Sequence, residues 1–247
     1  VEHYVARRTH QTMVGNIYLG RVQNVLPSME AAFIDIGRGR NAVLYAGEVN
    51  WDAVGLEGRP RRIESALNSG DAVLVQVTKD PIGHKGARLT GQSTLAGRYL
   101  VFIPHGSMMG ISRKLPESER GRLKKVLKKV MPAGAGVIVR TAAEGASEEQ
   151  LVADVERVSK QWDDITTREK HTKSGPTLVR GEPELAVRVV RDIFNEDFAQ
   201  LIIQGKDTYH TVSTYVEELS PELSDRVEQW VGTNDVFAEF RVDEQLA

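Results

Sequence analysis

The chain has 247 residues, of which 40% are hydrophobic and 27% charged, and its formal net charge is −2. This composition is typical of a globular protein with one or two domains, and it excludes a general basic field, so a nucleic-acid partner would have to meet a local patch. The absence of cysteine excludes disulfides and thiolate metal sites, and no apolar stretch or signal-peptide pattern predicts a membrane segment or export. We therefore expect a cytoplasmic protein.

Residues 15–95 have the pattern of short β-strands separated by turns. "GNIYLGRVQNV" and "EAAFIDIG" are rich in β-forming residues, and Pro27 lies between them, where it cannot join a central ladder. The alternation in "DAVLVQVTKD" places Val73, Val75 and Val77 on one face. About five such strands, with a turn signal roughly every ten residues, predict a small closed barrel or a sandwich.

The pattern changes after residue 95. "GRYLVFIP" and "GVIVRT" predict buried strands, and "LPESERGRLKKVLKKVMP" predicts a short helix that ends at Pro132. A long helix is predicted for "SEEQLVADVERVSKQWDDITTREK", because Ser147 and Gln150 form a capping box and the apolar residues follow helical spacing. Residues 171–183 are expected to be a connection that contains Gly and Pro.

The last part alternates between predicted helices and strands. "PELAVRVVRDIFNEDFAQLIIQG" predicts a helix that begins at Pro183 and leads into a strand, "SPELSDRVEQWVG" predicts another capped helix, and "VFAEFRV" predicts a last strand. This part is short of strands, and the N-terminal "HYVARR" would complete it by pairing with it. The barrel would then be an insertion in a split domain. Both ends of the chain look like cuts, so we expect a fragment.

The predicted barrel offers side chains that suit single-stranded nucleic acid. Small barrels of this kind bind such strands through exposed aromatic rings and nearby basic groups. Tyr18, Phe33 and Tyr45 are the aromatic candidates, with Lys85 and Arg88 in "GHKGARLT". The alternative is structural: Phe33 fills the barrel and Lys85 is a solvated loop residue.

The most basic segment is residues 113–129. It contains eight cations (Arg113, Lys114, Arg120, Arg122, Lys124, Lys125, Lys128 and Lys129) and two glutamates (Glu117 and Glu119), so its net charge is 8 − 2 = +6. The cations alternate with an apolar stripe, which predicts a helix with its basic side chains outward. Either this is a solvated surface, or Arg113, Lys114, Lys124 and Lys128 contact a phosphate backbone.

Arg140 and Thr141 follow the predicted strand "GVIV" at the point where a sheet gives way to a turn. A guanidinium fork matches phosphate oxygens, and a neighbouring hydroxyl can satisfy another oxygen. The pair therefore either lies on an ordinary surface or holds an anion.

The sequence shows no other site. The six histidines lack metal-ligand spacing, and there is no nucleophile elbow, phosphate-binding loop or carboxylate cluster. Asp35 and Asp192 lie in segments without further chemical signals, where a structural role is the simpler interpretation.

Five segments in order, "NIYLGRVQNVLPSMEAAFIDIGRGRNAVL", "GHKGARLT", "LAGRYLVFIPHG", "GISRK" and "VIVRTAAEGAS", resemble the N-terminal catalytic half of bacterial ribonuclease E/G endoribonucleases, and "GRGRNAVLYAGEV" resembles actinobacterial members. The resemblance implies an α+β protein of several subdomains. An S1-type OB-fold barrel (15–95) and a 5′-sensor subdomain (96–181) would be inserted in a split RNase H-like α/β subdomain (1–14 and 182–247).

The resemblance also implies roles for the second inserted subdomain. Arg140 and Thr141 in "VIVRT" match the pair that holds the 5′-monophosphate of RNA. Gly97 and Val101 in "LAGRYLV" match positions that line the same pocket.

In the barrel, Phe33 matches the aromatic residue that packs against a base, and Lys85 matches a residue that contacts RNA. One position departs from the family pattern, because the second barrel aromatic falls at Val43 in "RNAVLY". A valine offers apolar contact without a ring, so recognition by the barrel would be weaker or would use Tyr45.

The implied parent is a single-strand-specific endoribonuclease of RNA processing and mRNA decay, a homotetramer with degradosome partners. Its catalytic aspartates, magnesium and zinc would lie outside these residues, so we expect the fragment to be inactive alone. Two alternatives stay open: a non-catalytic OB-fold RNA-binding module that acts as a chaperone or adaptor, and a ribosome-associated structural protein.

Overall fold

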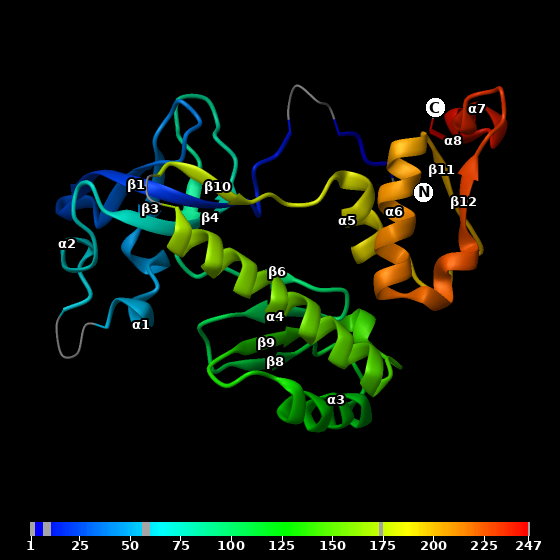
Figure 1. The fold of residues 1–247 in the computed structure, drawn as a ribbon, viewed down its shortest axis with the longest axis horizontal. Coiled ribbons are helices and arrows are strands. Elements are labelled where there is room, and N and C mark those ends of the chain that lie inside the picture. The colour runs from blue at the N-terminus through cyan, green and yellow to red at the C-terminus, as the bar shows by residue number, and fades with distance from the viewer. Residues whose placement is uncertain (1–2, 7–10, 56–59, 173–174, 247) are drawn as a thin grey trace. The chain divides into compact units, whose positions relative to one another are not determined.

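The computed structural model describes residues 3–6, 11–55, 60–172 and 175–246 (Figure 1). They fall into two compact units, one of residues 1–11 with 183–247 and one of residues 12–182. The fold class is mixed α and β, as predicted, while the subdomain boundaries predicted after residues 14, 95 and 181 stay predictions. Among the described residues, no helix has both the length and the apolar character that spanning a membrane requires.

A closed β-barrel forms the first part of the 12–182 unit. Its elements are β1 (Ile17–Leu26), β2 (Ala31–Asp35), β3 (Ala42–Tyr45), β4 (Ala72–Lys79) and β5 (Arg88–Thr90), with α1 (Trp51–Val54) and α2 (Ile63–Ala66) between β3 and β4. The strand order is β1-β2-β3-β5-β4, and the pairing of β4 with β1 closes the barrel in the order of an OB fold. Val75, Val77 and Leu89 are buried inside it, which confirms the predicted alternation of β4.

A second sheet of four strands follows. It has the order β6-β7-β9-β8, built from β6 (Leu95–Ala96), β7 (Leu100–Ile103), β8 (Met109–Ile111) and β9 (Gly136–Val139). Helices α3 (Glu117–Val130) and α4 (Glu148–His171) supply the apolar side chains that share a buried cluster with Leu100, Phe102 and Val139 of this sheet. The strands predicted at "GRYLVFIP" and "GVIVRT" and both helices are confirmed.

Helix α4 joins the barrel to the second sheet (Figure 1). The predicted capping box is present: Ser147 Oγ accepts from Gln150 N at 3.1 Å, and Gln150 Oε1 accepts from Ser147 N at 2.9 Å. The 24 residues of α4 contact both β7 and strand β10 (Thr177–Arg180), which pairs with β1. The expectation that 171–183 is only a connection was therefore wrong, because pairing with an open edge of β1 makes 177–180 a strand. Ile17 and Leu19 of β1 lie in the same buried cluster as Leu151 and Val158 of α4.

The second unit contains α5 (Leu185–Asp192), β11 (Leu201–Gln204), α6 (Lys206–Leu219), β12 (Val227–Trp230), α7 (Val236–Glu239) and α8 (Val242–Leu246). Strands β11 and β12 pair in parallel, with α6 as the connection between them. The predicted helix at "SPELSDRVEQWVG" was wrong: residues 221–226 form a 3-10 turn and residues 227–230 a strand. The strand predicted at "VFAEFRV" was also wrong, since α7 and α8 occupy it. Residues 3–6 of "HYVARR" form no strand, and residues 7 and 8 lie outside the described residues.

Candidate functional site

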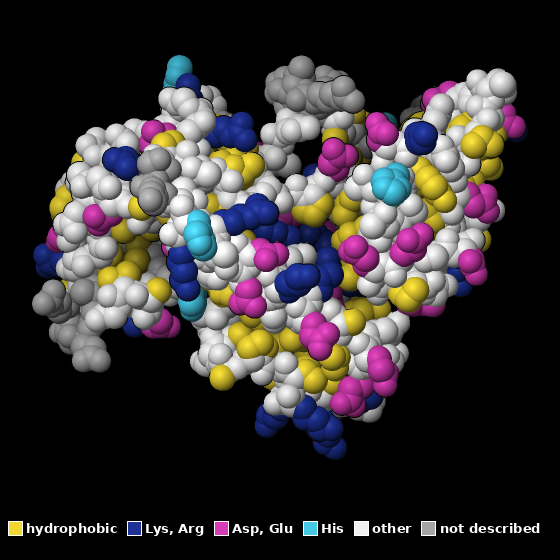
Figure 2. Space-filling view, viewed as in Figure 1, with side chains coloured by type: hydrophobic (Ala, Val, Ile, Leu, Met, Phe, Trp, Pro, Cys, Tyr) yellow, Lys and Arg dark blue, Asp and Glu magenta, His cyan; other side chains and the backbone are white. Residues whose placement is uncertain are grey.

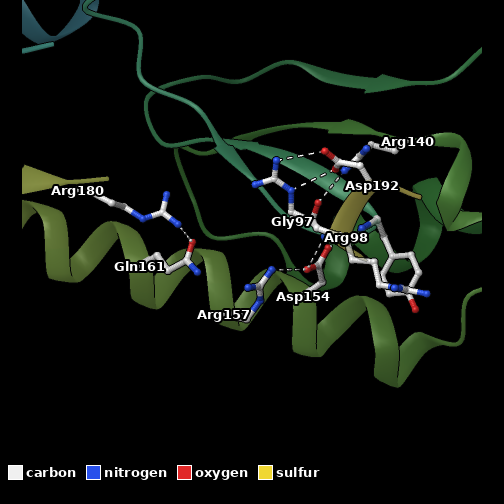
Figure 3. Close-up of polar contacts among 10 residues, drawn as sticks. Gly97, Arg98, Arg140, Asp154, Arg157, Gln161, Arg180 and Asp192 are labelled. Atoms are coloured by element: carbon white, nitrogen blue, oxygen red, sulfur yellow. Dashed lines mark hydrogen bonds and ion pairs between the residues drawn. The ribbon is translucent and has the colours of Figure 1, made fainter. Parts of the chain in front are cut away.

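The turn between β6 and β7 is held by a buried carboxylate on α4. Asp154 is 2% exposed, and its two oxygens accept from the backbone N–H groups of Arg98 at 3.0 Å and Tyr99 at 2.9 Å. Arg157, one turn further along α4, lies 3.5 Å from Asp154 Oδ1. A Cβ atom on Gly97 would lie 2.5 Å from Asp154 Oδ2, so this turn position requires glycine. Figure 3 shows Gly97, Arg98 and Asp154 gathered where the turn meets α4.

Arg140 comes directly after β9 and points back to the same turn. Its backbone N–H donates to Tyr99 O at 2.8 Å, and its Nη1 donates to Gly97 O at 3.0 Å. Val139 is buried and Ile138 is 40% exposed, so the alternation of the strand places Arg140 on the outward face with Ile138. Val101 pairs with Ile138 and lies on that face too. The structure thus brings Gly97, Val101 and Arg140 together at one end of the second sheet.

Thr141 opens a 3-10 turn, Thr141–Ala143, and is exposed. Two side chains of α3, Glu119 and Arg122, hold the chain beyond this turn. They form an ion pair with each other, in which two Arg122 nitrogens donate to the Glu119 carboxylate at 2.7 and 2.8 Å. Glu119 also accepts from Gly145 N at 3.0 Å, and Arg122 Nη1 donates to Ala146 O at 2.8 Å. The hydrogen bond from Arg122, with that from Gly145, lowers the pKa of Glu119 to about 2. This clamp fixes the segment that follows Thr141.

Two arginines of the basic segment 113–129 form ion pairs with glutamates of the same segment. Arg120 pairs with Glu117 and Arg122 with Glu119, so these two cations are committed within α3. The residues predicted as backbone contacts, Arg113, Lys114, Lys124 and Lys128, are all exposed, as are Lys125 and Lys129. Figure 2 shows basic side chains projecting over α3 at the lower edge of the view. The basic surface of α3 is therefore a set of lysines on one exposed face, with Arg113 and Lys114 just before the helix.

Two of the four RNA-binding residues predicted for the barrel lie directly opposite each other on neighbouring strands. Phe33 on β2 pairs with Val43 on β3, and Tyr45 lies two residues further along β3 on the same face. All three are half-buried, so Phe33 does not fill the barrel. Lys85 is exposed in the β4–β5 loop, where its N–H donates to Ile82 O at 2.9 Å. Gly86 packs so closely on the carbonyl group of Asn41 that a side chain there would overlap it, which fixes the base of this loop.

Asp154 and Arg98 were missed by the sequence analysis. Asp154 lies one turn from Leu151 and next to Val155, so a carboxylate on the apolar stripe of α4 was the signal that could have found it. Arg98 is 5% exposed, and its guanidinium lies over the Tyr99 ring, 5.6 Å from the centroid. Nothing in the residue pattern marks Arg98 as buried.

The 183–247 unit contains a hollow of about 650 Å³. Its walls are apolar side chains such as Leu185, Val189 and Phe237, from α5 and α7. Among the described residues, no three His, Asp or Glu side chains lie close enough together to hold a metal ion.

The chain is similar to known proteins over most of its length. The family model described as "Ribonuclease E/G family" matches residues 94–247. Ribonuclease G of Escherichia coli (strain K12) is 36% identical over 252 residues, which cover 99% of this chain and 51% of that protein. Ribonuclease E of Nostoc sp. (strain PCC 7120) is 38% identical over 221 residues, which cover 89% of this chain and 31% of that protein. The solution structure of GSP13 from Bacillus subtilis is 25% identical over 32% of this chain and 55% of that chain, with a TM-score of 0.26. The chain spans about half the length of the ribonuclease G sequences that it matches.

Proposed function

Because this chain belongs to the ribonuclease E/G family, we propose that its 12–182 unit binds single-stranded RNA and senses a 5′-monophosphate for an endoribonuclease of RNA processing and mRNA decay. The parent protein would be cytoplasmic and tetrameric, with degradosome proteins as partners. The observation that carries the proposal is the orientation of Arg140 by Gly97 at the end of the second sheet.

This geometry would allow the site to recognise the phosphate at the 5′ end of an RNA. The hydrogen bond to Gly97 O holds one nitrogen of the Arg140 guanidinium at the turn, and a planar guanidinium fork binds two phosphate oxygens side by side. The exposed Thr141 hydroxyl, on the next residue, would donate to a third oxygen. Val101 and Ile138, on the same face, would border the pocket with apolar surface. Charge-assisted hydrogen bonds of this kind contribute about 1.5–3 kcal/mol each, which is enough to distinguish a terminal phosphate from a hydroxyl.

The rest of the strand would be held at two further surfaces. In the barrel, the half-buried Phe33 would pack against a base and the exposed Lys85 would contact a phosphate. The basic surface of α3 would contact the backbone without reading sequence, so it would make binding dependent on salt. Lys85 and the lysines of α3 are exposed, and Phe33 lies on the outward face of β2.

We place the cutting step outside residues 1–247. The family resemblance implies magnesium and zinc in the parent enzyme, and among the described residues no three His, Asp or Glu side chains lie close enough together to hold a metal ion. We therefore assign no step to a metal here, and we expect the purified chain to show no magnesium-dependent cleavage. Measurable cleavage that persists through a further purification step would contradict this part of the proposal.

The sensing role is tested by binding of one short RNA that carries either a 5′-monophosphate or a 5′-hydroxyl. The wild-type chain should prefer the phosphate, and Arg140→Ala should lower that preference by about 10- to 100-fold, which corresponds to the loss of one charge-assisted hydrogen bond. Fluorescence anisotropy at two salt concentrations measures both affinities.

Arg113→Ala is the matched control, since it removes an exposed arginine before α3. This substitution should weaken the binding of both RNAs by the same factor and leave the ratio of the two affinities unchanged. If Arg140→Ala keeps the preference for the 5′-monophosphate, Arg140 is not the sensing residue. The affinity for the 5′-hydroxyl RNA reports separately on whether the chain binds RNA at all.

A further inference from the structure

One row of side chains crosses three neighbouring strands on the outer face of the barrel. Phe33 on β2 pairs with Val43 on β3, and Val43 pairs with Arg88 on β5. The residues before and after Val43 in β3 are buried at 0% and 1% exposure, so Val43 itself points outward. Arg88 is exposed, while Leu89, the next residue, is buried. The row therefore runs aromatic, apolar, cationic on one surface.

The cation in this row is stacked on an aromatic ring. The Arg88 guanidinium lies over the Tyr45 ring, with Cζ 5.0 Å from the ring centroid. Tyr45 is two residues beyond Val43 on β3 and so projects from the same face. Such a cation–π contact keeps the guanidinium over the ring, whereas without the contact the side chain would extend into solvent. Tyr45 and Arg88 thus form one composite group next to Val43.

We propose that Arg88, supported by Tyr45, is a second base-stacking group of the barrel and takes the place of the ring that Val43 lacks. This inference rests on the proposed RNA-binding function and deepens it. RNA bases stack on arginine guanidinium planes as well as on aromatic side chains. Val43 lies between Phe33 and Arg88 in the register, so two successive bases could pack on Phe33 and Arg88 with Val43 as an apolar floor between them.

The alternative for Arg88 is a simple charge that meets a phosphate. The two roles differ in what a lysine can replace, because lysine keeps the charge and loses the plane. Arg88→Lys is therefore the informative variant. Arg21→Lys is its matched control, since Arg21 is an exposed arginine on β1 of the same barrel.

The test uses the 247-residue chain and a single-stranded RNA with a 5′-hydroxyl, so that the terminal pocket is not engaged. One base is replaced by 2-aminopurine, whose fluorescence falls when it stacks. Arg88→Lys should lower the affinity by about 5- to 10-fold, the low end of the loss expected for one stacked base, and should reduce the quenching. The salt dependence should stay as in the wild-type chain, because the charge is retained, and Arg21→Lys should change neither readout.

A compensating variant separates stacking from charge. Adding Val43→Phe to Arg88→Lys restores a ring beside Phe33 and should bring affinity and quenching back to within about 2-fold of the wild-type values. Wild-type affinity and quenching in Arg88→Lys, or no recovery in the double variant, would overturn the inference. Phe33→Ala tests the proposed function separately: if the wild-type chain binds RNA and Phe33→Ala weakens it while Arg88→Lys does not, only this inference fails. A wild-type chain that does not bind RNA would contradict the proposed function itself.

Discussion

Gly97 and Asp154 lie so close that a Cβ atom on Gly97 would be 2.5 Å from Asp154 Oδ2. The carboxylate fills the space beside the glycine because it accepts from the two N–H groups that follow, those of Arg98 and Tyr99. The same turn presents Gly97 O to Arg140. A carboxylate on α4 therefore sets the position of the guanidinium that we assign to phosphate binding.

Gly97→Ala should disturb this arrangement. The added methyl group meets a buried carboxylate that cannot move without losing two hydrogen bonds, so we expect the free energy of unfolding to fall by about 1–3 kcal/mol. Urea denaturation followed by circular dichroism measures it. Gly121→Ala in α3 is the control, because its Cβ would meet nothing within 4 Å. A gain of about 0.5–1 kcal/mol is expected there, from a helix position. Equal effects of the two substitutions would contradict the steric explanation.

Asp154→Asn should leave one backbone N–H in the turn without an acceptor. An asparagine has one acceptor oxygen and one donor nitrogen, so one of the two N–H groups would face a donor. The expected loss is about 1–3 kcal/mol, measured in the same denaturation experiment. Asp163→Asn, on the exposed side of α4, should stay within about 0.5 kcal/mol of the wild-type value. The phosphate preference should fall with Asp154→Asn as well, since Gly97 O orients Arg140.

The Glu119–Arg122 clamp predicts a dependence of stability on pH. Folding lowers the pKa of Glu119 from its ordinary value of 4.5 to about 2, so between these two values the folded chain binds fewer protons than the unfolded chain. The stabilisation from the clamp is then complete above pH 4.5 and is lost as the pH falls toward 2. Thermal denaturation of the wild-type chain and Glu119→Gln between pH 3 and pH 7 measures it. At pH 7 the variant should unfold at a lower temperature than the wild-type chain, and the difference between the two melting temperatures should narrow below pH 4.5. A difference that stays constant with pH would contradict the ion pair as its source.

The basic surface of α3 predicts a change in salt dependence. If Lys124 and Lys128 each meet one phosphate, replacing both with glutamine should make the slope of log K against log[salt] shallower by about 1.4, which is about 0.7 for each contact with a single strand. Anisotropy between 50 and 300 mM salt measures the slope. Lys206→Gln, an exposed lysine in α6, removes a charge elsewhere and should leave the slope unchanged. An unchanged slope in the double variant would make this helix face a solvated surface.

Local patterns predicted the elements whose stability is mostly local. The alternation of β4 and the capping box of α4 are both present because side-chain period and cap chemistry act within a few residues. The residue pattern also placed Arg140 and Thr141 at the end of a strand, where β9 gives way to a turn. Their roles came from family resemblance, since a guanidinium beside a hydroxyl is equally compatible with an ordinary surface.

Segments whose state depends on a partner far along the chain were mispredicted. Residues 227–230 have helix-compatible spacing, and they form a strand because β11 offers a parallel edge to pair with. Residues 177–180 form a strand for the same reason, on the edge of β1.

The sequence by itself determined the alternating strands of a small barrel, two amphipathic helices and a basic segment, because these depend on the order of neighbouring residues. Only the tertiary structure decided which of these groups meet. Asp154 contacts the turn that begins at Gly97 because α4 packs against the second sheet. Arg88 contacts Tyr45 because β5 pairs with β3. Contacts between residues 40 to 60 positions apart depend on how strands pair and helices pack, and no local pattern records that.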